Sequence, residues 1–216
     1  MRRPFDLIVF DWDGTLMDSA AKICRCIGAA AADCGIGDPG HERSRQIIGL
    51  GLVEALKALF PDVPTTEHQR LAERYRYYFV NEDTTATPLF PGVRDGLEGL
   101  VRAGYRLAVA TGKSRRGLDV SMKDSGTSDL FCASRCADES RSKPDPSMLE
   151  ELLVLCGAER SRTVMVGDTS FDLEMARNAG MPRFAVTYGA HARERLLDYG
   201  PITCFDSFPE LRTYFA

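Results

Sequence analysis

The feature that most constrains the fold of this chain is the regular alternation of short apolar segments and longer amphipathic segments after residue 92. The short segments have the length of buried strands, and the longer ones have the 3.6-residue spacing of helices. Strands that alternate with helices form parallel sheets, because a helix carries the chain back to the start of the next strand. The predicted strands cover residues 105–110, 130–133, 163–166, 184–187 and 202–205, and the predicted helices cover residues 93–103, 115–124, 146–155 and 171–179.

One more strand is predicted far upstream, at Leu7–Phe10, where four consecutive apolar residues are typical of a strand buried on both faces. Residues 16 to 85 then show only helical spacing, and the alternation of strand and helix resumes after Pro88. We therefore predict an α/β core with a doubly wound parallel sheet, formed by residues 1–15 and 88–216, and an inserted helical domain of residues 16–87. Hinges between the two are expected near Leu16–Asp18 and Thr85–Pro88.

Length and composition permit this fold and exclude several classes of protein. A chain of 216 residues, 44 % of them hydrophobic, can bury an ordinary core without covalent staples. The net charge of −4 disfavours a nucleic-acid binder that relies on phosphate contacts. No segment approaches the roughly 20 apolar residues of a membrane span, and the apolar run after Met1-Arg2-Arg3 is too short for a signal peptide. We expect a cytoplasmic monomer or homodimer with no nucleic-acid or membrane partner.

The cysteines give no sign of a disulfide framework or a zinc site. Their number, seven, is odd, and their spacing contains no paired CxxC motif. The three histidines, His41, His68 and His191, lie far apart in the sequence, which disfavours zinc. We therefore expect reduced cysteines that behave as small apolar residues.

Polar residues follow the predicted strands at their carboxyl ends, where open α/β sheets bind ligands. Carboxylates gathered on one rim raise each other's pKa and destabilise the fold unless a cation lies among them. Oxygen donors without nearby histidine or cysteine favour magnesium, which often takes part of its shell from a phosphate. The residues on this predicted rim are Asp11, Asp13, Thr111, Gly112, Lys113, Lys143, Asp168 and Asp172.

Such a rim contains the groups that phosphoryl transfer requires. Asp11 can attack phosphorus and form an aspartyl-phosphate, and Asp13 can protonate the leaving alcohol and then activate water. Lys143 can place a positive charge beside the phosphate. The Thr111 hydroxyl and the backbone N–H of Gly112 can donate hydrogen bonds to it. Taken singly, each of these residues could instead belong to an ordinary turn or helix cap.

Four segments in order resemble the motifs of the haloacid dehalogenase superfamily. They are Phe10–Leu16, Ala110–Lys113, Ser142–Pro146 and Val166–Asp172. The resemblance covers essentially the whole chain and implies a Rossmann-like core. The helical segment resembles the C1 cap of the phosphoglycolate phosphatase-like branch of that superfamily.

The resemblance implies a role for each matched residue. It makes Asp11 the nucleophile and a magnesium ligand, and Asp13 an acid/base whose backbone carbonyl also binds the metal. Thr111 and Lys143 are implied to hold the phosphoryl group, and Asp168 to bind magnesium. Asp172 is implied to orient a metal-bound water. Haloacid dehalogenases lack the second aspartate, so the presence of Asp13 indicates a phosphotransferase, although Trp12 is larger than the family's usual residue there.

The predicted function is therefore a magnesium-dependent phosphatase that acts on a small phosphorylated metabolite. A β-phosphoglucomutase-like mutase, a pyrophosphatase and a nucleotidase are alternatives on the same scaffold, and a non-catalytic binding protein is a third class. The natural substrate is left open. In the cap, the Gly49–Gly51 loop is either a helix break or a specificity loop. Arg45 is either a solvated side chain or a ligand for a second anionic group of the substrate.

Overall fold

The computed structural model describes residues 3–216, so Met1 and Arg2, part of the predicted core segment and of the basic N-terminus, lie outside the described residues. Within that range the core contains a six-stranded sheet in the order β3-β2-β1-β4-β5-β6, in which every pair of neighbouring strands is parallel. The strands are β1 (Leu7–Phe10), β2 (Arg106–Thr111), β3 (Ala133–Cys136), β4 (Thr163–Gly167), β5 (Arg183–Val186) and β6 (Cys204–Phe205). The predicted doubly wound α/β class is confirmed.

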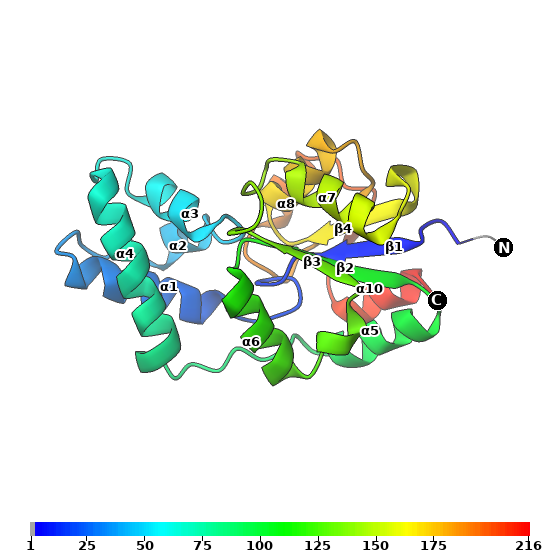
Figure 1. Ribbon diagram of the computed structural model, residues 1–216, viewed down its shortest axis with the longest axis horizontal. Helices are drawn as coiled ribbons and strands as arrows, with labels where there is room; N and C mark the ends of the chain where they lie inside the picture. The colour runs from blue at the N-terminus through cyan, green and yellow to red at the C-terminus, as the bar shows by residue number, and fades with distance from the viewer. Residues whose placement is uncertain (1–2) are drawn as a thin grey trace.

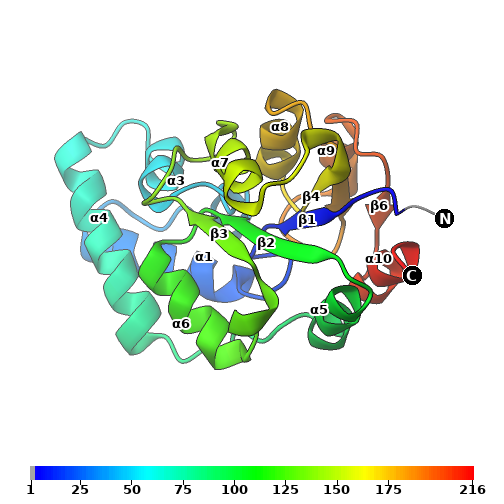
Figure 2. The same ribbon diagram turned by 45° about the vertical axis from the view of Figure 1, so that its right-hand side comes forward.

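Strand β1 is central, and its four residues alternate between two buried faces. Ile8 and Phe10 pack with the helices on one face, and Leu7 and Val9 pack with the helices on the other. This explains why the strand is continuously apolar rather than alternating. Helices α5 (Val93–Arg102), α6 (Arg115–Ser125) and α10 (Phe208–Tyr214) cover the first face, and α7 (Ser147–Cys156) and α8 (Ser170–Asn178) cover the second, as Figure 2 shows.

The order of the strands reverses at β1. The chain moves from β1 outward through β2 to β3, and then crosses to β4 and moves outward on the opposite side through β5 to β6. A reversal of this kind opens a crevice at the carboxyl ends of the two strands that flank it, because their connections leave in opposite directions. The strand arrows in Figure 1 point toward the helical segment, so the crevice faces it.

Four helices and a helical turn make up the inserted segment, which lies to the side of the sheet opposite the two chain ends (Figure 1). They pack around a hydrophobic cluster of their own, which includes Ile27, Leu56 and Leu71. The predicted separate domain of residues 16–87 remains a prediction, and this cluster is its main support. The elements are α1 (Ala20–Asp33), α2 (His41–Arg45), α3 (Leu52–Leu59), α4 (Thr65–Tyr77) and the π-helical turn η1 (Tyr78–Glu82).

The two connections between the helical segment and the sheet lie side by side. Met17 forms an antiparallel bridge with Leu89. The backbone N–H of Asp18 donates to the carbonyl of Pro88 at 2.8 Å, and Phe90 donates to Leu16 at 2.9 Å. The predicted hinge segments therefore contact each other, which gives the helical segment one compact attachment to the core.

The third strand does not lie where its sequence predicts. Residues 128–130 form a 3₁₀ turn, η2 (Ser128–Leu130), and the strand begins at Ala133. The strand is at the edge of the sheet and half-exposed, so its sequence carries no apolar run. Pairing of Ala133 with Ala108 on β2 sets its position instead. Several short helical elements are also absent from the sequence prediction, because short helices depend on tertiary packing. They are the helices α2, α9 (Arg193–Leu197) and α10 and the turn η3 (Arg160–Arg162).

Trp12 fits the core although it is unusually large for its position. Its indole is fully buried, and Nε1 donates to the Ser121 hydroxyl at 2.9 Å. The ring meets Phe131 edge-on, with 6.0 Å between centroids. Helix α6 and the segment after it thus accommodate the larger side chain. Among residues 3–216, no helix has the length and apolar content that a membrane crossing requires.

Phe184 on β5 is the centre of an aromatic cluster and a test of the packing on this face. Its ring is fully buried and makes edge contacts with Phe5 and Phe205. Phe184→Ala is expected to lower the free energy of unfolding by about 3–5 kcal/mol, because it removes a large ring and leaves a cavity. Urea unfolding followed by circular dichroism measures this loss. Leu155→Ala, at a half-exposed position, is the control and is expected to change stability by at most about 0.5 kcal/mol.

Candidate active site

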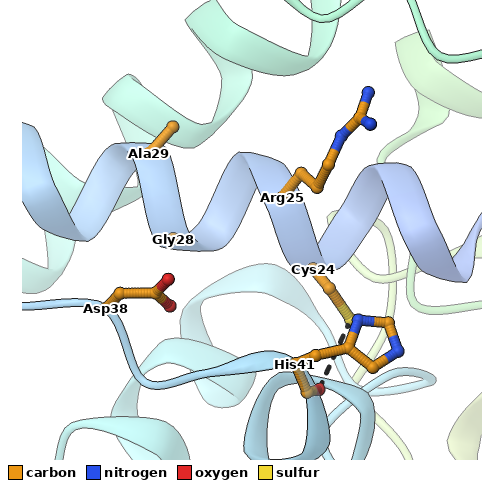
Figure 3. Close-up of a pocket in the computed structure, with 6 residues that line it drawn as sticks. All are labelled: Cys24, Arg25, Gly28, Ala29, Asp38 and His41. Atoms are coloured by element: carbon orange, nitrogen blue, oxygen red, sulfur yellow. Dashed lines mark hydrogen bonds between the residues drawn. The ribbon is translucent and has the colours of Figure 1, made fainter.

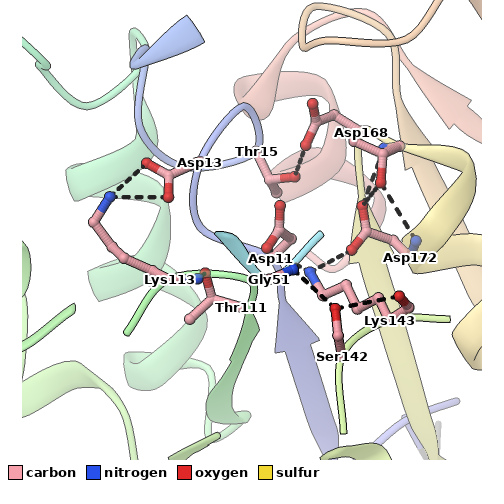
Figure 4. Close-up of polar contacts among 11 residues, drawn as sticks. Asp11, Asp13, Thr15, Gly51, Thr111, Lys113, Ser142, Lys143, Asp168 and Asp172 are labelled. Atoms are coloured by element: carbon pink, nitrogen blue, oxygen red, sulfur yellow. Dashed lines mark hydrogen bonds and ion pairs between the residues drawn. The ribbon is translucent and has the colours of Figure 1, made fainter. Parts of the chain in front are cut away.

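The carboxyl ends of β1, β2 and β4 bring the predicted residues together at the edge of the sheet (Figure 4). Asp11 follows β1 directly, and its backbone N–H donates to Val166 on β4 at 2.9 Å. Thr111 ends β2, and Asp168 follows β4. All three of these polar side chains are at most 1 % exposed, which is rare unless buried polar groups are paired or bind a ligand.

Lys143 enters this edge from the loop before α7 and bridges two carboxylates. Its Nζ donates to Asp11 Oδ1 and to Asp172 Oδ1, each at 2.6 Å, and all three side chains are buried. Burial alone would lower the pKa of Lys143, but the two carboxylates outweigh this effect and raise the pKa. The side chain is therefore a permanent ammonium beside Asp11.

Asp11, Asp168 and Asp172 form a cluster whose ligand oxygens all lie within 4.8 Å of one another. Burial raises the pKa of Asp11 well above its usual range, and Lys143 offsets this only in part. Burial, together with the charge of Asp172, raises the pKa of Asp168 to about 7. Among the residues that the structure describes, Asp11 Oδ2 is buried without a hydrogen-bond partner. An unpartnered oxygen in an all-oxygen cluster fits a hard divalent cation.

Asp168 is fixed by contacts on both of its oxygens. The Thr15 hydroxyl donates to Oδ1 at 2.7 Å, and the backbone N–H of Ala190 donates to Oδ2 at 2.7 Å. Gly14 has a φ of +93°, and a Cβ there would overlap Asp168 Oδ2. The run Asp13-Gly14-Thr15 therefore serves the geometry of Asp168, a role for Gly14 and Thr15 that the sequence analysis missed.

Asp172 is tied to the start of α8. The N-cap of this helix is Thr169, not Asp168, and Thr169 forms a capping box with Asp172. Asp172 Oδ2 accepts from the Thr169 hydroxyl at 2.7 Å and from its N–H at 3.0 Å. Its other oxygen faces Lys143. The capping box thus holds Asp172 inside the carboxylate cluster, with an oxygen within 4.8 Å of the ligand oxygens of Asp11 and Asp168.

Asp13 faces away from this cluster. Both of its oxygens accept from Lys113 Nζ at 3.0 Å, and Oδ1 also accepts from the Ser19 hydroxyl at 2.7 Å. Ser19 stands at the N-cap of α1, but its side chain makes no capping bond because it is bound to Asp13. Figure 4 shows this pair apart from the group around Lys143. The sequence analysis gave Lys113 no role, although it follows Thr111-Gly112 directly.

The Gly49–Gly51 loop of the helical segment rests on the phosphate-binding residues predicted on the core. A Cβ on Gly112 would overlap the carbonyl of Leu50, and the N–H of Gly51 donates to the Ser142 hydroxyl at 2.8 Å. The loop is therefore more than a break between helices. It forms part of the surface of the helical segment that covers the carboxyl ends of the strands.

Arg45 anchors the same region to the core. Its Nε donates to the carbonyl of Ala190 at 2.7 Å, and its Nη2 donates to the carbonyl of Gly189. These contacts give the half-buried Arg45 side chain an anchoring role that neither sequence interpretation included. His191 adds a second contact, since its Nδ1 accepts from Ser170 and its Nε2 meets the Gln46 carbonyl at 3.1 Å. Burial lowers the pKa of His191 to about 4 and keeps the ring neutral.

A cavity of about 1,210 Å³ lies between the helical segment and the carboxyl ends of the strands. Asp11, Asp13 and Thr111 line it on the core side.

A second cavity, of about 250 Å³, lies on the far side of α1 within the helical segment (Figure 3). There the Cys24 thiol contacts the backbone carbonyl of His41, at 3.7 Å, rather than its ring. Burial raises the pKa of Cys24 to about 11, so this pair offers no thiolate ligand for a metal.

Comparisons with known proteins agree with this geometry. Residues 8–186 match the family model described as haloacid dehalogenase-like hydrolase, and the chain belongs to that family. It is 34 % identical over 209 residues to the probable phosphatase IndB of Dickeya dadantii, covering 95 % of this chain and 91 % of the relative. It is 28 % identical over 210 residues to the phosphoglycolate phosphatase of Agrobacterium fabrum, covering 95 % and 90 %. The resemblance to the phosphoglycolate phosphatase-like branch and the assignment to the phosphatases are confirmed.

Solved structures share the fold over the full length. A predicted phosphoglycolate phosphatase from Haemophilus somnus superposes with a TM-score of 0.88 at 24 % identity, and all of both chains is covered. A putative β-phosphoglucomutase from Bacteroides vulgatus gives 0.84 at 20 % identity, covering 97 % of this chain and 86 % of that one. At these identities the likeness defines the architecture and not the reaction.

The raised pKa of Asp168 predicts how the stability of the metal-free protein depends on pH. Between the ordinary carboxyl range and about 7, the folded protein keeps a proton that the unfolded chain has lost, so stability falls as the pH rises. A divalent cation replaces this proton and stabilises the protein more at high pH than at low pH. Melting curves with chelator and with excess Mg²⁺ measure both effects. At roughly 100 times its Kd, the ion is expected to raise Tm by roughly 5–10 °C near pH 8.

Asp168→Asn is the control for this effect, because it removes the titrating group and leaves the shape of the side chain. The variant is expected to lose most of the difference in the Mg²⁺-induced shift of Tm between pH 5 and pH 8. An equal shift of Tm at both pH values in the wild-type protein would contradict the prediction.

Proposed function

We propose that this chain is a magnesium-dependent phosphatase that hydrolyses a small phosphate monoester through an aspartyl-phosphate on Asp11. The observation that carries the proposal is the state of the Asp11 carboxylate. One oxygen is held by Lys143, and the other is buried and unpartnered at the end of the central strand. A carboxylate fixed in this way is pre-oriented for attack on an electrophile in the adjoining cavity.

Within the proposed reaction, an oxygen of Asp11 forms a bond to phosphorus as the bond from phosphorus to the leaving oxygen breaks. Lys143 holds Asp11 in place and contributes positive charge beside the phosphoryl oxygens. The Thr111 hydroxyl and the N–H of Gly112 are proposed to donate hydrogen bonds to the same oxygens. Asp11, Asp168 and the backbone carbonyl of Asp13 are the proposed magnesium ligands. Bound Mg²⁺ would neutralise charge on the phosphoryl group.

Asp13 is proposed to balance the protons. It gives one proton to the leaving alcohol, and it later takes one from the water that attacks the aspartyl-phosphate and releases inorganic phosphate. Its position supports this role, because it lines the same cavity as Asp11 but is anchored by Lys113 on a different side.

The helical segment is proposed to be a C1 cap that opens to admit the substrate and closes to exclude water. The contacts of the Gly49–Gly51 loop and Arg45 with the core support a closed state. Opening would occur at the paired connections around Met17 and Leu89. A cytoplasmic location and a monomeric or homodimeric state remain predictions from the sequence.

Turnover of p-nitrophenyl phosphate tests the proposed function directly. Hydrolysis in the presence of Mg²⁺ is expected to be abolished by EDTA and restored by excess Mg²⁺. No turnover of any phosphate ester would support a non-catalytic binding protein instead. A phosphoenzyme that survives in water but transfers its phosphoryl group to a sugar phosphate would support the mutase alternative.

Asp11→Asn is expected to lower kcat by about 10⁴-fold or more, because an amide is a poor nucleophile for phosphorus. The variant keeps the size of the side chain, so its circular dichroism and Tm report whether the fold is intact. Asp198→Asn, at an exposed position on the far side of α9, is the matched control and is expected to retain full activity. A folded Asp11→Asn protein with wild-type kcat would refute the nucleophile assignment.

Asp13→Asn is expected to slow both formation and hydrolysis of the phosphoenzyme, by about 10²–10⁴-fold, which is the usual contribution of acid/base catalysis. Rapid-quench measurements separate the two steps. With a good leaving group such as p-nitrophenolate, which needs no proton, formation is expected to slow less than hydrolysis. Unchanged rates for both steps would remove Asp13 from the mechanism.

A further inference from the structure

The wall of the large cavity on the side of the helical segment is largely apolar, although Lys22, Glu54, Arg76 and Asn81 also line it. Ile23 and Ile27 come from α1, Ile47 and Ile48 from the loop after α2, and the rings of Tyr75 and Phe79 from α4 and η1. We call these six residues the apolar wall. Figure 1 shows the elements that carry them, α1, α4 and the segment after α2, within the helical segment toward which the strands point.

Two of the cationic side chains that line the cavity, Arg76 and Arg116, are exposed. Arg45 donates to backbone carbonyls of the core, and Lys113 is paired with Asp13. Lys22 lies at the cavity with its ammonium over the ring of Phe79, 4.7 Å from the centroid. A carboxylate placed deep against the isoleucines would lose its water without gaining a paired charge, which is strongly unfavourable.

The aromatic part of the wall carries one polar group that points to a ligand. The rings of Tyr75 and Phe79 contact each other with 5.7 Å between centroids, and both are only partly buried. Within residues 3–216 the Tyr75 hydroxyl has no hydrogen-bond partner. Burial, together with the charge of Asp13, raises the pKa of this hydroxyl well above the usual range. An unpartnered hydroxyl in an apolar wall is suited to orienting a ligand.

We propose that the apolar wall selects phosphate monoesters whose alcohol part is an apolar or aromatic group larger than glycolate, with Tyr75 and Phe79 as specificity-determining residues. This inference rests on the proposed function. In-line displacement places the leaving oxygen opposite Asp11, so the alcohol part extends from the core toward the helical segment. The apolar group then leaves water against the isoleucines and the rings, while the phosphoryl group stays at the edge of the sheet.

The test compares benzyl phosphate with phosphoglycolate, which are both esters of poor leaving groups. The wild-type protein is expected to show a kcat/KM at least about tenfold higher for benzyl phosphate, the discrimination that an apolar pocket typically provides. Equal values, or a preference for phosphoglycolate, would overturn the inference. Calorimetric titration with 2-phenylethylphosphonate and 3-phosphonopropionate gives the same ranking without turnover. A protein that binds in the expected order but hydrolyses neither ester would disprove the proposed function and leave the apolar wall intact.

Substitution at Tyr75 separates the wall from the rest of the site. Tyr75→Arg adds a cation and is expected to shift the ratio of the two kcat/KM values toward phosphoglycolate by about tenfold. Tyr75→Leu keeps the wall apolar and is expected to retain the preference for benzyl phosphate. Ile202→Arg places the same cation at an exposed site outside the cavity, and its ratio is expected to equal that of the wild-type protein. A ratio that moves equally in all three variants would overturn the assignment of Tyr75.

A second inference comes from the amino ends of the strands, opposite the candidate active site. Cys132, just before β3, and Cys156, the last residue of α7, lie with their Sγ atoms 3.5 Å apart. Cys132 is exposed and Cys156 is half-buried, and both are free thiols. The N–H of Cys132 is bonded to Leu107 at 2.8 Å, and the carbonyl of Cys156 accepts from the guanidinium of Arg106. The backbone on both sides is therefore fixed, and the pair is held together by the packing of α7 on β3.

The two thiols differ in their readiness to react. The hydrogen bond with Cys156, together with the charge of Arg106, lowers the pKa of Cys132 to about 6, whereas the same contact raises the pKa of Cys156. An exposed, ionised thiol is the usual site of attack on peroxides, and a second thiol in contact with it resolves the product.

The geometry points to Cys132 and Cys156 as a pair that peroxide converts to a disulfide. The Cys132 thiolate forms a bond to one oxygen of hydrogen peroxide as the O–O bond breaks, which gives a sulfenic acid and a hydroxide ion that takes a proton from the solvent to become water. Cys156 then attacks the sulfenic sulfur, the S–S bond forms, and the oxygen leaves as a second water. Two thiols lose two electrons in total, and one peroxide is reduced to two waters. The resulting bridge joins the ends of the segment that carries Lys143.

Thiol counting and peptide mapping of the full chain test the pair. Brief treatment with hydrogen peroxide is expected to lower the thiol count of the unfolded protein from seven to five, because one bridge consumes two, and a tryptic map is expected to show Cys132 joined to Cys156. Cys156→Ser is expected to abolish the bridge. Cys204→Ser is the control and is expected to keep it, since Cys204 is half-buried and makes no sulfur contact in the described structure. A count that stays at seven, or a bridge between other cysteines, would overturn the inference.

Discussion

The ammonium of Lys143 between Asp11 and Asp172 is the interaction on which the site depends. Three carboxylates are buried at one edge of the sheet, and their mutual repulsion would favour protonation or exposure if no positive charge lay among them. Lys143 compensates part of that charge and also holds Asp11 in one orientation. What it leaves uncompensated, at Asp11 and Asp168, is the charge that a divalent cation can neutralise. Lys143 therefore links the stability of the carboxylate cluster to the metal affinity that we propose for it.

The topology of the sheet explains why these groups meet. Asp11, Thr111 and Asp168 are separated by long stretches of sequence, yet each lies at the carboxyl end of a strand next to the reversal of strand order. Within the described residues, helices cover both faces of the sheet, so these groups are approached from the carboxyl ends of the strands. The helical segment closes that approach, and it supplies an apolar surface opposite a highly charged one. The two halves of the cavity thus match the two ends of the substrate class proposed above.

How much of this could be predicted from the sequence depends on the range of the contacts involved. The strand at Leu7–Phe10 and the residues at the strand ends were predictable, because an apolar run and a short motif are local patterns. The position of β3 was not, since pairing with β2 decides it. The partners of Asp13 and Arg45, and the contact of Cys132 with Cys156, join residues distant in sequence. No local pattern reports such contacts, and for this reason the sequence did not indicate the anchoring contacts of Arg45.

The side-by-side connections near Met17 and Leu89 have a consequence for the history of such a chain. The helical segment leaves and rejoins the sheet at adjacent points that are hydrogen-bonded to each other. In the topology of the sheet it is therefore equivalent to a long loop. Lengthening a loop whose ends are already together costs little conformational entropy. A different helical segment with ends at the same spacing could therefore be inserted there. Evolution or a protein engineer could in this way exchange the helical segment and leave the charged residues at the strand ends unchanged.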